Sequence, residues 1–259
     1  MSTLIWIILF CLIGGVLSAM AAGTFLLLSD ERRRRVMPSL IGFATGTLLG
    51  AAFLAILPHA LSGRQVDVHR ITTTVLLGIL GFFLLEKFVL WRHYHANMDH
   101  APDLEIERGR DKAPGIMVLI GDGLHNLMDG VLIAAAFLTD RHLGVVTAIA
   151  VTAHEIPQEV GDFVLLLHSG FSRARALVFN VLSSTTTVIG GIAAYASLED
   201  AEKVVPYVLA VAAASFIYIA IADLIPTLHK HTQPLVTGQQ LAMITLGIAL
   251  IAFTHAELH

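Results

Sequence analysis

Charged residues are scarce in this sequence: they make up 14% of the 259 residues, whereas hydrophobic residues make up 56%. A soluble domain normally carries about 25% charged residues, so this chain cannot cover its surface for water. The single cysteine, Cys11, excludes an internal disulfide and a cysteine-rich metal site. The net charge of −4 is too small to indicate a nucleic-acid partner. The composition therefore indicates an integral membrane protein.

Long apolar runs recur along the whole chain, each bounded by charged residues, proline or glycine. A helix that spans a bilayer needs about 20 mostly apolar residues, and runs of this length are not membrane strands. We therefore expect an all-α integral membrane protein whose residues 1–259 form one transmembrane domain. The predicted spans are residues 3–28, 36–61, 71–91, 115–138, 143–168, 175–198, 204–228 and 239–257.

Lysine and arginine are unevenly distributed between alternate loops, and cytoplasmic loops normally carry the excess. If the loops that are richer in lysine and arginine are cytoplasmic, both termini lie outside and the number of spans is even. The longest loop, residues 92–114, is then also cytoplasmic; its histidines His93, His95 and His100 would either capture metal leaving a pore or be a chance feature of a solvated loop. The inner set is Arg32–Arg35, Arg92, Arg108, Arg110, Lys112, Arg173, Arg175 and Lys230; the outer set is Arg64, Arg70, Arg141 and Lys203.

Two short patterns occur twice in the sequence. Residues 125–130 read HNLMDG and residues 154–159 read HEIPQE, on the fourth and fifth predicted spans. Residues 56–59 read ILPH and residues 224–227 read LIPT, on the second and seventh spans. Each pair lies on spans that run in opposite directions, an arrangement typical of transporters built from inverted repeats around a midplane site.

Polar and ionisable residues gather in the middle of the fourth and fifth spans. Each ionisable group at the bilayer centre costs about 2.5–3.5 kcal/mol, so a group of them on neighbouring helices needs compensation. A hydrogen-bond network between helices would compensate, but ligand-like spacing on shared helix faces favours metal or proton chemistry. Histidine with carboxylate and no thiolate suits zinc, iron, manganese, cobalt or cadmium. These residues are Asp122, His125, Asn126, Asp129, His154, Glu155, Gln158, Glu159 and Asp162.

An enzyme is the alternative interpretation of the fifth span. The segment His154-Glu155-Ile156-Pro157-Gln158 approaches the His-Glu-x-x-His helix of zinc proteases. Gln158 replaces the second histidine, however, and Pro157 lies in the turn that must align the ligands. We therefore expect a transporter rather than an intramembrane zinc-dependent hydrolase.

At these residues the sequence resembles the ZIP (Zrt-/Irt-like) family of metal transporters, and most closely the subfamily of the His-rich animal ZIPs. The fourth-span segment 125–130 matches the family pattern HNxx[DE]G, and the fifth-span segment 154–163 matches the HEIP[HQ]E-type pattern. The likeness extends over nearly the whole chain in the same order. The other similar segments are 50–53, 57–59, 85–87, 180–183 and 218–226.

The resemblance implies eight helices with both termini outside and import of a divalent metal, typically zinc, toward the cytoplasm. It places a first metal site on His125, Asp129, His154 and the position of Gln158. Zn²⁺ or another divalent transition metal is then the transported substrate, and no prosthetic group is expected. The expected partners are this metal and the lipid bilayer, with a homodimer left open, and the expected location is a bacterial inner (plasma) membrane.

Some family members carry a neighbouring second site, which the resemblance places on Asn126 and Glu155. That site also uses a glutamate on the sixth span, where this chain has Thr187. Because a threonine lacks the bridging charge of a carboxylate, we predict one tightly bound metal rather than two. Glu159 belongs to the fifth-span motif, and its role as a direct ligand or as support for a ligand stays open.

Overall fold

Each long apolar run forms helix in the computed structural model, which describes residues 2–62, 66–98, 113–198, 203–230 and 233–257. Within these ranges the chain contains helices and turns but no strand, so the predicted all-α class is confirmed. The elements are α1 (Thr3–Leu12), η1 (Ile13–Leu17), α2 (Ser18–Phe25), α3 (Asp30–Gly50), η2 (Ala51–Ile56), α4 (Leu57–Leu61), α5 (Val68–Met98), α6 (Ala113–Thr139), α7 (Arg141–His168), α8 (Arg173–Ser184), α9 (Thr186–Leu198), α10 (Val205–Tyr218), η3 (Ile219–Leu224), α11 (Ile225–Leu228) and α12 (Pro234–Glu257).

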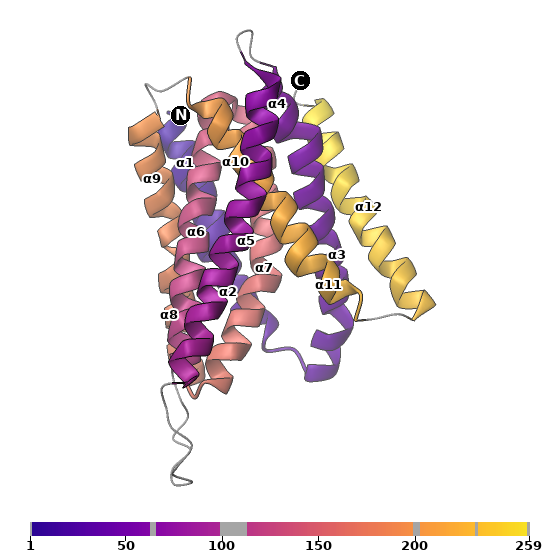
Figure 1. Ribbon diagram of the computed structural model, residues 1–259. Helices are drawn as coiled ribbons and strands as arrows, with labels where there is room; N and C mark the ends of the chain where they lie inside the picture. Colours follow the sequence, from indigo (N-terminus) through magenta and orange to yellow (C-terminus); the bar gives the residue numbers. More distant parts are fainter. Residues whose placement is uncertain (1, 63–65, 99–112, 199–202, 231–232, 258–259) are drawn as a thin grey trace.

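Seven helical stretches in the described part of the chain are long and apolar enough to cross a membrane. The remaining long helix, α7, is lower in hydropathy because it carries Glu155, Glu159 and Asp162. It nevertheless lies within the bundle (Figure 1), with most of its Leu143–Leu166 segment packed against neighbours. Burial inside a helical bundle, rather than contact with lipid, accommodates these polar side chains.

The predicted span limits are close to the observed helices, but three ends differ by five residues or more. Helix α12 begins at Pro234, before the predicted start at residue 239. Helix α3 begins at Asp30, before the predicted start at residue 36, since its first turns include the arginines. Helix α5 continues to Met98, so the predicted loop 92–114 begins inside a helix. Residues 99–112, which include His100, lie outside the described residues.

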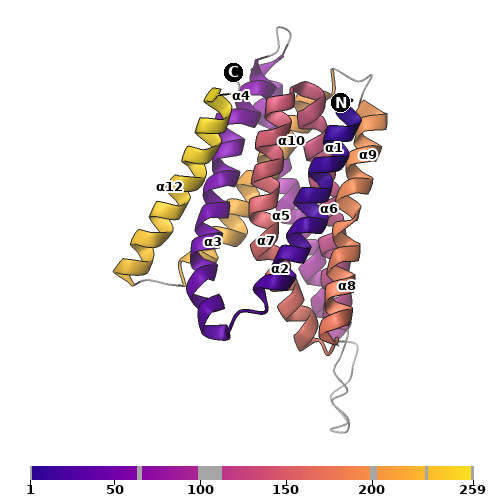
Figure 2. The ribbon, with the colours of Figure 1, turned by 180° about the vertical axis from the view of Figure 1, so that it is seen from behind.

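The repeated Pro-containing patterns adopt the same local structure. Each follows a six-residue π-helix: η2 precedes Leu57-Pro58, and η3 precedes Ile225-Pro226. Figures 1 and 2 show the two rods α3–η2–α4 and α10–η3–α11 running in opposite directions through the bundle. The sequence repeat is therefore also a repeat of backbone geometry, as an inverted-repeat architecture requires.

Glycines bring two pairs of helices into close contact. At Gly130 of α6, an added Cβ would lie 1.9 Å from the backbone oxygen of Thr187 in α9. At Gly46 of α3, it would lie 2.1 Å from the backbone oxygen of Ile244 in α12. Gly42, Gly46 and Gly50 form one row on α3, and each packs closely against α12.

The ends of the described chain lie at the same end of the bundle (Figures 1 and 2). The segment Arg32–Arg35 at the start of α3 and the pair Arg173 and Arg175 at the start of α8 lie at the opposite end. Arg64, Arg108, Arg110 and Lys112, which also enter the predicted charge asymmetry, lie outside the described residues. The described arginines on these helices therefore gather on the side away from the two termini.

Asp140 caps the start of α7. Its carboxylate accepts hydrogen bonds from the backbone N–H groups of His142 (2.8 Å) and Leu143 (3.2 Å). Partial burial raises the pKa of the Asp140 carboxyl, but these N–H donors and nearby histidines lower it further, so the pKa lies below its ordinary value. The ionised cap therefore stabilises the fold at neutral pH, and the contribution is lost as the pH falls through the lowered pKa.

We predict that Asp140→Ala lowers the stability of the detergent-solubilised protein at pH 7 by about 1 kcal/mol, the usual cost of losing an N-cap. Asp140→Asn, which keeps an acceptor oxygen, should lose less than Asp140→Ala. Thermal unfolding of the three proteins tests this, and equal midpoints would contradict the capping role.

Candidate metal site

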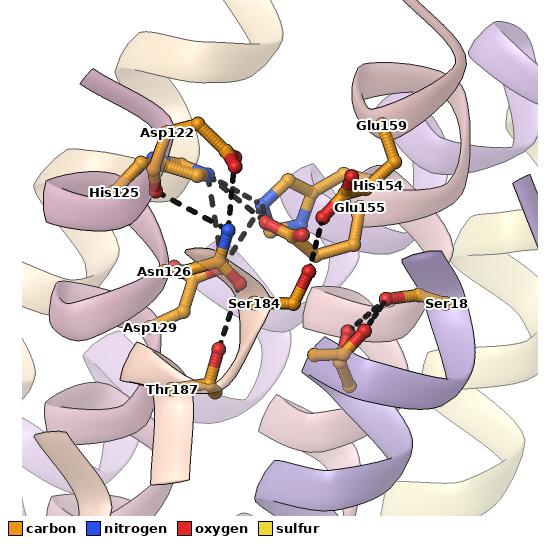
Figure 3. A network of polar contacts seen from close by, with 12 residues as sticks. Ser18, Asp122, His125, Asn126, Asp129, His154, Glu155, Glu159, Ser184 and Thr187 are labelled. Carbon is orange, nitrogen blue, oxygen red and sulfur yellow. Dashed lines mark hydrogen bonds and ion pairs between the residues drawn. The ribbon is translucent and has the colours of Figure 1, made fainter. Parts of the chain in front are cut away.

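Four side chains from α6 and α7 meet in the middle of the bundle (Figure 3). His125 and Asp129 come from α6, and His154 and Glu155 come from α7. Each offers one ligand atom, and these atoms all lie within 4.8 Å of one another. We refer to these four residues as the central cluster.

Three distances within the central cluster match those between the ligands of a tetrahedral metal site. The Nε2 atoms of His125 and His154 are 3.3 Å apart. Nε2 of His125 lies 3.3 Å from Oε1 of Glu155, and Nε2 of His154 lies 3.3 Å from Oδ2 of Asp129. Zinc ligands at about 2.0–2.1 Å in tetrahedral geometry are about 3.3–3.4 Å apart. Two further distances are 3.7 Å and 3.9 Å, between His125 and Asp129 and between His154 and Glu155.

The carboxylates of the central cluster are buried and lack hydrogen bonds. Asp129 is 1% exposed and Glu155 is 0% exposed. Within the described part of the chain, none of their four side-chain oxygens has a hydrogen-bond partner. Buried polar groups in this condition are costly, and a cation between the carboxylates would satisfy them. The donor set of two imidazoles and two carboxylates suits zinc and similar divalent metals.

The imidazole of His154 is oriented by its own helix. Its Nδ1 lies 3.0 Å from the backbone oxygen of Ala150, and because a carbonyl only accepts, Nδ1 carries the hydrogen. In the neutral imidazole, Nε2 is then the unprotonated nitrogen, and it faces the central cluster. Metal-binding histidines are commonly held in this way, with the second ring nitrogen donating to a carbonyl or carboxylate.

Asn126, Gln158 and Glu159 lie differently from the four residues of the central cluster. The amide oxygen of Asn126 accepts a hydrogen bond from Thr187 Oγ1 (2.7 Å), and its nitrogen donates to Asp122 Oδ1 (2.9 Å). Glu159 Oε1 accepts from Ser184 Oγ (2.6 Å). Gln158 is half-buried, and no hydrogen bond between described residues involves its amide. Glu155, which the resemblance placed in a second site, therefore lies among His125, Asp129 and His154, which it placed in the first site.

A row of hydroxyl groups at the α8–α9 junction supports the polar residues of α6 and α7. Besides the bonds from Ser184 and Thr187, Ser183 donates to Asp122 and Thr186 donates to the backbone oxygen of Gly123 (2.7 Å). Sequence reasoning did not assign these roles. The signal was present as the run Ser183–Thr187 in an otherwise apolar span, but only the folded chain shows which acceptor each hydroxyl meets.

Several other histidines, including the predicted candidates His93 and His95, are apart from the central cluster. His93 and His95 lie on the last turns of α5 rather than in a loop. At the opposite end of the bundle, the rings of His59 and His255 are in edge contact, with centroids 5.7 Å apart.

Comparison with known proteins identifies the family. The family model "ZIP Zinc transporter" matches residues 92–255, which contain the whole central cluster and make up more than half of the chain. The chain belongs to the ZIP family. In its described residues, this ZIP protein has the all-helical structure and the long apolar helices that the sequence predicted.

Relatives of this ZIP protein occur in animals and yeast. It is 31% identical to zinc transporter ZIP13 of Pongo abelii, over 83% of this chain and 66% of the relative. It is 39% identical to human zinc transporter ZIP10, over 52% of this chain but only 17% of the relative. It is 28% identical to yeast zinc transporter YKE4, over 86% of this chain and 72% of the relative. The chain thus spans about two thirds of ZIP13 and a small part of ZIP10.

These relatives are named zinc transporters, and none is named a hydrolase. The protein is therefore a member of a family whose named relatives are transporters, and these names give no support to the intramembrane hydrolase alternative. As a ZIP protein with seven described helical stretches able to cross a bilayer, it is a membrane protein.

Proposed function

We propose that this ZIP protein is a secondary transporter that carries a divalent metal, zinc in the first place, through the membrane toward the cytoplasm. The observation that carries the proposal is the central cluster, in which three ligand-atom distances of 3.3 Å match tetrahedral spacing and the buried carboxylates have no hydrogen bonds. The nucleotide-binding motifs of ATP-driven pumps are not visible in the sequence, so concentration gradients would drive the movement.

The charge of the central cluster fits a divalent ion. Asp129 and Glu155 in their ionised forms contribute two negative charges, which a divalent cation neutralises, while neutral imidazoles of His125 and His154 replace its hydration water. A monovalent cation would leave a net charge in a medium of low dielectric constant, which is unfavourable. The donor set therefore supports divalent over monovalent cargo.

The proposed topology has eight spans, with α7 as the polar span at the centre and both termini outside. The arginines at the starts of α3 and α8 then face the cytoplasm, in agreement with the positive-inside rule. Metal would enter from the end of the bundle that holds the termini and leave at the opposite end. The relatives named above are eukaryotic, and a bacterial inner membrane stays a prediction about location.

Close glycine contacts suggest which helices move together. Every described glycine whose added Cβ would meet a neighbour within 4 Å makes that contact inside one of two groups of helices. One group contains α1, α2 and α6–α9 with the central cluster, and the other contains α3–α5 and α10–α12. We propose that alternating access moves the first group as a unit against the second.

Metal uptake into proteoliposomes tests the function. Purified protein in liposomes loaded with a zinc-sensitive dye should show uptake of zinc, and of cobalt, manganese, iron or cadmium at other rates, with and without a pH gradient. Protein-free liposomes and liposomes given sodium or potassium are the controls. Absence of flux for every divalent ion, combined with hydrolysis of a membrane peptide that Glu155→Gln abolishes, would overturn the proposal.

The proposed site holds one metal per chain, because Thr187 occupies the place where a second site would need a carboxylate. We predict that wild-type protein retains one zinc after gel filtration and that Thr187→Glu retains a second, as measured by elemental analysis. Thr185→Glu is the matched control, since its hydroxyl bonds to the backbone of Leu182 and does not meet Asn126. Two tightly held zinc ions in the wild type would contradict the prediction.

A further inference from the structure

We propose that an anionic phospholipid of the cytoplasmic leaflet binds between α2 and α8, with an acyl chain in an apolar groove and its phosphate beside Arg33 and Arg173. The site is separate from the central cluster. The choice of leaflet rests on the proposed topology, and the effect on conformation rests on the proposed movement of the two helix groups; the binding site itself rests on neither.

The apolar groove has a volume of about 670 Å³ and lies between α2 and α8. Met20, Leu27, Val178 and Leu182 line it and are all exposed on the bundle surface. Gly23 deepens it, because a Cβ at this position would lie 2.8 Å from Cδ1 of Leu177. The positions 177–185 on one wall correspond to about 12 Å of helix, so the groove can hold a stretch of hydrocarbon chain.

The two polar residues of the apolar groove offer it no free hydroxyl donor. Thr24 donates to the backbone oxygen of Ala21 (2.7 Å), and Thr185 donates to that of Leu182 (2.6 Å). A polar ligand or an ordered water chain would therefore find little to bind. Hydrocarbon is the occupant that this lining fits.

A second cavity, of about 600 Å³, continues the apolar groove toward the end of the bundle and shares Gly23, Leu27 and Leu177 with it. Its lining adds two arginines, Arg33 and Arg173, and the described lining contains no acidic residue. Arg33 is half-buried, whereas the neighbouring Arg32, Arg34 and Arg35 are exposed. We refer to this second cavity as the arginine cavity.

The two cavities follow each other along the bundle as the head group and the acyl chain do in a phospholipid. The arginine cavity lies where α3 and α8 begin, at the proposed cytoplasmic end, and the apolar groove runs from it toward the middle of the membrane. Basic pockets between membrane helices on this side suit anionic head groups, and the start of α8 adds the positive end of its helix dipole. A zwitterionic head group would bring its ammonium group toward the same arginines, so an anionic lipid is favoured.

The arginine cavity also joins the two groups of helices proposed to move. Arg33 lies on α3 and Arg173 on α8, in different groups. A phosphate held by both arginines would stabilise the present arrangement of the groups. The lipid would therefore act on the conformational equilibrium of the protein as well as on its stability.

Lipid binding by the purified full chain tests the site without a transport assay. Native mass spectrometry with phosphatidylglycerol and phosphatidylcholine of identical acyl chains should show preferential binding of phosphatidylglycerol. Arg33→Gln with Arg173→Gln should weaken this binding, by about fivefold per arginine if each contributes as basic residues do near anionic membranes. Arg173→Gln alone should weaken phosphatidylglycerol binding less than the double variant does.

The apolar groove is tested by Val178→Trp, which fills it from an exposed position; this variant should weaken binding of both lipids. Arg34→Gln and Ile189→Trp are matched controls, being exposed changes on α3 and α9 that line neither cavity. Equal binding of the two lipids, or variants that bind phosphatidylglycerol as the wild type does, would show ordinary boundary lipid and overturn the proposal. Because no metal flux is measured, either result is independent of the transport function.

Discussion

His154→Ala is expected to abolish most zinc uptake while the protein still inserts and remains folded. The variant removes one of four ligand atoms and leaves the buried carboxylate of Asp129 without the imidazole that lies 3.3 Å from it. Loss of groups that merely support metal ligands already costs about 10–100-fold, so we expect uptake to fall by about 100-fold or more. Dye-based uptake in proteoliposomes at matched protein density measures it, and His125→Ala and Asp129→Ala should behave alike.

His168→Ala is the matched control for this variant. His168 lies on the same helix, and its Nδ1 contacts the backbone oxygen of Val164 (2.9 Å), as that of His154 contacts Ala150. It is, however, exposed near the end of α7. Uptake by His168→Ala should therefore match the wild type, and normal uptake by His154→Ala at wild-type density would remove the central cluster from the transport path.

Gly130→Ala is expected to destabilise the protein severely, although it adds only one methyl group. The new Cβ would lie 1.9 Å from the backbone oxygen of Thr187 and 2.7 Å from the backbone nitrogen of Gly191. Backbone atoms cannot turn away as a flexible side chain can, so α6 and α9 must separate. Overpacking in a core costs about 1–3 kcal/mol, and we expect a loss at or above the upper end of this range.

The same separation should disturb the metal site, because the Thr187–Asn126 and Thr186–Gly123 hydrogen bonds cross this contact. Gly121→Ala on the same helix is the matched control, since nothing lies within 4 Å of its added Cβ. Removal of a helix glycine should leave stability unchanged or raise it by up to about 1 kcal/mol. Equal thermal midpoints and equal zinc retention in the two variants would contradict the packing argument.

The positions of the helices were predictable from the sequence because insertion into a bilayer requires long apolar runs. The polar character of α7 shows why such a prediction needs more than hydropathy: its ionisable residues lower its mean hydropathy, yet burial among other helices accommodates them. The repeated Pro patterns predicted paired spans, and the matching π-helices η2 and η3 followed only from the structure. Sequence periodicity carries no signal for one extra residue in a helical turn.

The sequence by itself determined the class of protein, the faces on which His125 and Asp129 or His154 and Gln158 lie, and the chemistry that those residue types favour. Helical periodicity is a local property, so it fixes which side chains of one helix share a face. It does not fix how two helices are rotated toward each other or how closely they approach. Those were decided by tertiary packing, in which the glycine contact between α6 and α9 brings Thr187 to Asn126 and the α6–α7 contact brings Glu155 to His125.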